Sequence, residues 1–139
     1  MKNTLAVILA TGALLLAAAP LWAHHAFGAE FDANKPVKFK GTVVKMEWIN
    51  PHAWIRIDVK GDDGKTTQWM IEAAAPNALL RRGWTKNSLL PGTEIYIEGF
   101  QALDGTNKAN GSVITLVADG KKLFVGSSAG DPGAAPGAK

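Results

Sequence analysis

The stretch VKFKGTVVKMEW, residues 37–48, decides the fold. Alternating apolar and polar residues predict a β-strand, because successive side chains of a strand point to opposite faces. The alternation here changes phase once, from Val37 and Phe39 to Val44, Met46 and Trp48. Gly41 lies between the two sets, so the stretch predicts one long strand that is bent or bulged at Gly41.

Shorter segments of the same kind follow at residues 52–59, 66–73, 94–100 and 112–118, and residues 121–125 predict a final extension of the sheet. The turn residues 61–64, GDDG, join the first two segments into a predicted hairpin. Between the second and third segments, residues 76–83 predict a short helix. This helix has Pro76 in its first turn, arginines in its last turn and Gly83 to end it.

Three strands, a helix and two strands predict an all-β fold with one short helix, arranged as a five-stranded OB-like barrel. In that architecture the first strand is long and curved, and the helix lies between strands three and four. A small β-sandwich or an open meander is the alternative, although either would require more strands at even spacing.

The chain of 139 residues is long enough for one domain, and both of its ends are predicted to lie outside that domain. Residues 1–23 read as a signal peptide, because Lys2 precedes an apolar run that is too short to span a membrane. Cleavage after Ala23 predicts a periplasmic protein that begins at His24 and has no membrane span after processing. Residues 126–139, rich in Gly, Ala and Pro, predict a disordered tail, which leaves residues 24–125 for the domain.

Composition and motifs exclude several classes of function. The net charge of +3 arises from scattered lysines and arginines, which argues against nucleic-acid binding. The absence of Cys excludes disulfides, thiolate metal sites and thiol nucleophiles. No HExxH, P-loop or nucleophile-elbow pattern is present, so we expect no catalytic residues and no enzymatic activity. Glu72 is expected to be a solvent-facing carboxylate.

The three histidines, His24, His25 and His52, are the candidate metal ligands. A mature terminus at His24 would offer an α-amine and an imidazole from one residue, and His52 could add a second imidazole. Such a set of nitrogen ligands suits Cu(II), so the predicted function is a copper carrier or scavenger. The alternative is that His24 and His25 are polar residues of a frayed terminus and that His52 hydrogen-bonds backbone.

A second candidate site consists of Trp48, Asn50 and Trp54, which precede or begin the second predicted strand. Exposed tryptophans on a barrel can stack on sugars or small apolar ligands, although a domain of this size usually places most of its tryptophans in the core. This site supports the alternative function, an OB-like module that binds a small ligand or a periplasmic protein and holds no metal.

Three motifs, HHAFGAEFD, KGTVVKMEWINPHAWIRIDV and PNALLRRGW, occur in order between residues 24 and 84. In these motifs the chain resembles a family of small exported bacterial proteins classed as a domain of unknown function. The resemblance covers nearly all of the predicted domain. It implies a secreted single domain and supplies no activity.

Overall fold

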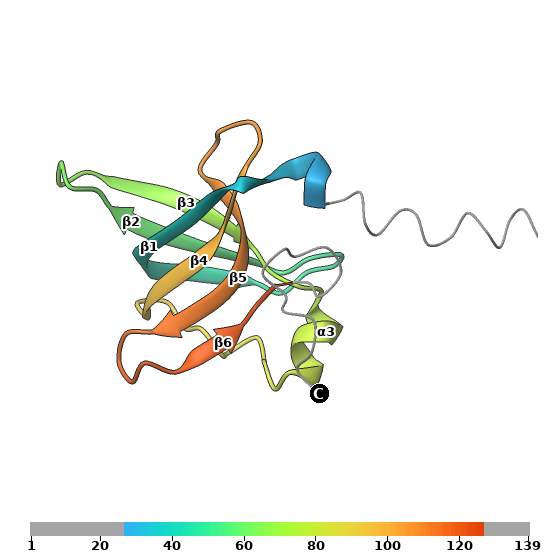
Figure 1. Ribbon diagram of the computed structural model, residues 1–139. Coiled ribbons are helices and arrows are strands. Elements are labelled where there is room, and N and C mark those ends of the chain that lie inside the picture. Colours follow the sequence, from blue (N-terminus) through green and yellow to red (C-terminus); the bar gives the residue numbers. More distant parts are fainter. Residues whose placement is uncertain (1–26, 127–139) are drawn as a thin grey trace, which may run out of the picture.

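The structure is a computed structural model that describes residues 27–126 (Figure 1). Three predicted features lie outside the described residues. They are the signal peptide, the candidate ligands His24 and His25, and residues 127–139 of the tail.

Six strands and two short helices make up the described chain (Figure 1). The strands are β1 (Phe31–Glu47), β2 (Trp54–Lys60), β3 (Thr66–Glu72), β4 (Glu94–Ala102), β5 (Lys108–Leu116) and β6 (Lys122–Phe124). The helix α3 (Pro76–Arg81) follows β3, and one helical turn at residues 27–30, which we call the N-terminal turn, precedes β1. Within residues 27–126, no helix is both long enough and apolar enough to cross a membrane.

The strands form one mostly antiparallel sheet in the order β3-β2-β1-β4-β5-β6. A parallel pairing between β3 and β5 then joins the two sides of the sheet, so that β1 to β5 form a ring. The predicted hairpin is confirmed, because β2 pairs with β3 along its whole length. The predictions of a mostly β fold and of a helix that begins at Pro76 are also confirmed.

The first strand is longer than predicted and bends at a different residue. It begins at Phe31, and its register with β2 shifts between Val43 and Lys45, so the bulge lies at Val44 and the prediction of a bulge at Gly41 is wrong. Val43, not Val44, is buried in the core. Gly41 serves close packing instead, because a Cβ there would lie 2.9 Å from Ile57 Cδ1.

The core fills the ring with aliphatic side chains that alternate along the strands. Its largest fully buried members are Val43, Ile55, Ile57, Ile71, Leu79, Leu89, Ile95, Ile97, Ile114 and Val125. Leu79 comes from α3, which lies at one end of the ring (Figure 1). Gly83 follows α3 with a φ of 81°, a left-handed conformation that ends a helix at little cost for glycine. Trp84 then enters the core.

Close approach of β4 and β5 predicts an asymmetry between two glycine substitutions. A Cβ on Gly99 would overlap the backbone carbonyl oxygen of Asn110, whereas a Cβ on Gly28 would meet nothing within 4 Å. We expect Gly99→Ala to destabilise the fold by about 3 kcal/mol, since backbone cannot move aside as a side chain can. Gly28→Ala should change the free energy of unfolding by less than about 0.5 kcal/mol. Urea denaturation of both variants measures the difference, and equal destabilisation would contradict this packing.

Candidate functional site

His52 lies just before β2, at a point where the hairpin pairing continues beyond the two strands. The backbone N–H of Ala53 donates to Ala74 O over 3.2 Å, and the N–H of Ala73 donates to Ala53 O over 2.8 Å. These bonds hold the residue before β2 against the residues after β3. As a result, the His52 ring contacts Glu72 and Ala73.

The contacts of His52 define which ring nitrogen carries a proton. Nδ1 lies 3.0 Å from Glu72 Oε1 and 3.1 Å from the backbone oxygen of Ala73. A carbonyl oxygen can only accept a hydrogen bond, so Nδ1 must be the donor. In the neutral ring, Nε2 therefore keeps its lone pair. The His52 side chain is 35% exposed, which leaves part of the ring accessible from solvent.

Glu72 is buried, and the expectation of a solvent-facing carboxylate is wrong. Its side chain is only 8% exposed. Burial raises the pKa of Glu72 above its ordinary value of 4.5, because a low-dielectric surrounding disfavours the charged carboxylate. The positive field of His52 opposes this rise, Glu30 adds to it by charge repulsion, and Lys108 opposes it. Glu72 is thus a buried carboxylate whose charge depends on its neighbours.

Asn110 is the neighbour of Glu72 across the parallel pairing of β3 and β5. It is 4% exposed, and with Glu72 it makes up the buried polar residues of the described chain. Within residues 27–126, its Oδ1 has no hydrogen-bond partner. Two polar side chains on neighbouring strands are therefore withdrawn from water on the outer face of the ring, opposite the core side chain of Ile71.

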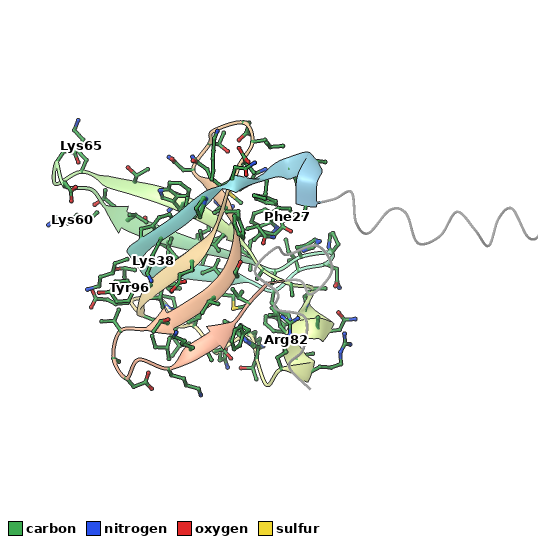
Figure 2. All side chains as sticks on the ribbon, viewed as in Figure 1. Phe27, Lys38, Lys60, Lys65, Arg82 and Tyr96 are labelled. Atoms are coloured by element: carbon green, nitrogen blue, oxygen red, sulfur yellow. The ribbon has the colours of Figure 1, made fainter. Side chains whose placement is uncertain are left out.

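The N-terminal turn lies near these two residues. Lys108 Nζ, on β5, is 3.5 Å from Glu30 Oε1 in the turn and lies 6.0 Å from the centre of the Phe31 ring. The Phe27 ring packs edge-on against Phe100 at a centroid distance of 5.7 Å. These contacts hold the start of the described chain on the outer face that carries Asn110 and Glu72, and Figure 2 shows Phe27 at that end of the chain.

The residues of the predicted ligand site have different positions. Trp54 begins β2 directly opposite Glu72 and is half-buried, so it belongs to the same outer face. Trp48 packs against the core, and Asn50 is exposed in the loop before β2. The structure therefore brings Trp54 to the His52–Glu72 pair, whereas Trp48 contributes to packing.

The described residues do not hold a complete metal site by themselves. Among residues 27–126, no three side chains of His, Asp or Glu gather closely enough to bind a metal ion. His52 offers one lone-pair nitrogen, with a carboxylate and a carbonyl behind the other nitrogen. Metal-binding histidines in proteins commonly have such a hydrogen-bond acceptor on the nitrogen that does not bind the metal.

Comparison with known proteins identifies the family. The model of a family of unknown function, DUF6152, matches residues 13–112. This chain belongs to that family. No curated protein matches the DUF6152 chain. The matched range includes His52, Glu72, Lys108 and Asn110, together with the predicted ligands His24 and His25.

The raised pKa of Glu72 predicts a pH-dependent effect of Glu72→Gln on stability. A carboxyl group with a raised pKa in the folded state stabilises the fold fully below its ordinary value of 4.5, and this contribution is lost as the pH rises through the raised value. The glutamine side chain does not ionise, so the variant has no such loss of stability as the pH rises. Its free energy of unfolding, relative to that of the unaltered protein, should therefore increase between pH 4 and pH 8.

Urea denaturation at several pH values measures this difference. Glu94→Gln is the matched control, because the Glu94 carboxylate is 51% exposed and pairs with Lys40 on the surface. The control should show no comparable increase with pH. A Glu72→Gln difference that stays flat across this range would contradict the buried position of the carboxylate.

Proposed function

We propose that this DUF6152 protein is an exported, periplasmic copper-binding protein that acts as a carrier or scavenger. Its Cu(II) ligands would be the α-amine and imidazole of His24 and the imidazole of His52. A nitrogen set of this kind matches the preference of Cu(II) for tetragonal coordination. The proposal assumes cleavage after Ala23, which makes His24 the first residue of the mature chain.

The orientation of His52 is the observation that carries the proposal. Its Nδ1 donates toward the backbone oxygen of Ala73 and the carboxylate of Glu72, so Nε2 is the nitrogen available to a metal. A carboxylate behind a ligating histidine fixes the ring and increases the basicity of the metal-binding nitrogen. A histidine that served packing alone would not require an ionisable partner.

The position of the N-terminal turn supports a shared site. Glu30 in this turn lies close enough to Glu72 to affect its pKa, so the chain enters the domain near the His52 pair. His24 precedes Phe27 by three residues, which span at most about 10 Å when extended. His25 offers a different nitrogen set, formed with the amine and the intervening amide.

The scaffold of the proposed site is an OB-like barrel. The ring order β1-β2-β3-β5-β4, with a helix between β3 and β4, supports this assignment. A rigid ring suits a binding protein, because it fixes the position of His52 before the metal arrives.

The alternative function is an OB-like module that binds a small ligand or a protein partner at Trp54 and its neighbours Trp48 and Asn50, without metal.

A comparison of two N-termini tests the proposal. A form that begins at His24 should bind one Cu(II) at least tenfold more tightly than the same chain with its α-amine acetylated. Acetylation converts the His24 amine into an amide, which cannot bind the metal until it loses its proton. Competition with a chelator of known copper affinity measures both constants.

Substitution of His52 separates the proposed site from a terminal chelate. His52→Ala should weaken binding at least tenfold and change the electron paramagnetic resonance spectrum of Cu(II), whereas Asn50→Ala, at an exposed loop position, should change neither. If His25→Ala abolishes binding and His52→Ala has no effect, the metal is held by the terminal peptide alone. If all forms bind copper weakly and equally, the alternative function remains: a module that binds a ligand or a protein and holds no metal.

A further inference from the structure

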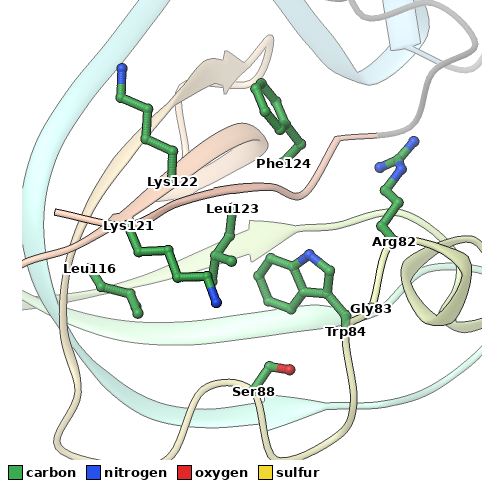
Figure 3. Close-up of a pocket in the computed structure, with 9 residues that line it drawn as sticks. All are labelled: Arg82, Gly83, Trp84, Ser88, Leu116, Lys121, Lys122, Leu123 and Phe124. Atoms are coloured by element: carbon green, nitrogen blue, oxygen red, sulfur yellow. The ribbon is translucent and has the colours of Figure 1, made fainter. Parts of the chain in front are cut away.

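A pocket lies between the residues that follow α3 and the strands β5 and β6 (Figure 3). Its volume is about 600 Å³, which is within the range of pockets that bind small molecules. The cavity is lined by residues from the end of α3, from the segment after it, and from β5 and β6. None of these residues belongs to the proposed copper site.

The charged side chains that line this pocket are all cationic. They are Arg82, Lys121 and Lys122, and no Asp or Glu is among the lining residues. Across the described range, none of the three forms an ion pair with a carboxylate. Unneutralised cations around a cavity create a positive potential that favours an anionic ligand.

The neutral polar side chains of the pocket can also donate hydrogen bonds. The Ser88 hydroxyl accepts a bond from the N–H of Thr85 over 2.8 Å, so its own proton is available to a ligand. The Trp84 indole can only donate, and its N–H has no partner among residues 27–126. Figure 3 shows the Lys121 side chain running toward Trp84 and Ser88, whereas Lys122 points the other way.

Apolar side chains line the side of the pocket that faces Lys121. The indole of Trp84 is 3% exposed and forms a fixed wall, and Leu116 and Leu123 line the cavity with it, whereas Phe124 points away with Lys122 (Figure 3). The Arg82 guanidinium is held in place by a hydrogen bond to the backbone oxygen of Gly126. The cavity therefore combines a flat apolar surface with hydrogen-bond donors and positive charge.

We propose that this pocket binds a small organic anion with an aromatic body, such as an aromatic sulfonate or carboxylate. The anionic group would lie near Lys121 and Ser88, and the ring would pack against Trp84, Leu116 and Leu123. This binding is independent of copper, so it can be tested on protein kept free of metal by a chelator.

Two fluorescent probes of the same shape test the proposal on the full mature chain. The first is 8-anilinonaphthalene-1-sulfonate, which carries an anion, and the second is N-phenyl-1-naphthylamine, which is neutral. The sulfonate should bind at one site at least tenfold more tightly than the neutral probe. Its binding should weaken as NaCl is raised, because salt screens the lysine charge.

Lys121→Gln should weaken sulfonate binding at least fivefold. Lys60→Gln is the matched control, since it removes the same charge at the tip of the β2–β3 hairpin, far from Arg82 (Figure 2). Leu123→Ala should weaken both probes, because it removes an apolar side chain that points toward Trp84 (Figure 3). Circular dichroism checks that each variant is folded. Lys121 and Lys60 are exposed, and Leu123 is half-buried.

Three results would overturn this proposal. They are equal affinity for the two probes, equal effects of Lys121→Gln and Lys60→Gln, and sulfonate binding that is unaffected by both Lys121→Gln and Leu123→Ala. None of these results depends on whether His52 binds copper, so failure of this pocket and failure of the copper site can be distinguished.

Discussion

The parallel pairing of β3 with β5 is the constraint on which the rest of the structure depends. It involves three residue pairs, and it joins the two sides of the sheet into a ring. The approach is close, since a Cβ on Gly111 would lie 2.7 Å from Ile71 Cγ2 and 3.2 Å from Val125 Cγ1. The same pairing places Asn110 beside Glu72. Closure of the ring and formation of the buried polar site therefore depend on the same few residues.

Local sequence signals predicted most of the fold, because strands and helix ends are determined largely by neighbouring residues. The alternation in β2 and the proline and glycine around α3 led to the correct elements. The position of the bulge in β1 could not be predicted from neighbouring residues. Both Gly41 and Val44 lie where the apolar pattern changes phase, and glycine is the usual choice at a bulge. Contact with Ile57 on the neighbouring strand requires Gly41 for packing, and the bulge lies at Val44.

The candidate site was predictable only in part. His52 could be identified because the chain has three histidines and the other two lie at the predicted mature terminus. Glu72 could not, since alternation places it opposite Ile71, on the face of the strand that usually meets solvent. Its burial depends on contacts between distant parts of the chain, including Glu30 with Lys108 and the pairing of β3 with β5. No signal near Glu72 in the sequence contains this information.

The burial of Glu72 supports the role that we propose for the His52–Glu72 pair. An ionised carboxylate withdrawn from water is costly, and a buried ion pair is often no more stabilising than apolar side chains of similar volume. The Ala73 carbonyl alone would suffice to hold the Nδ1 proton and orient the ring. Glu72 adds a second acceptor next to Nδ1, and a carboxylate in this position is common behind histidines that bind a metal. Hydrogen bonding of the ring does not require this second acceptor, whereas the copper site that we propose would use it.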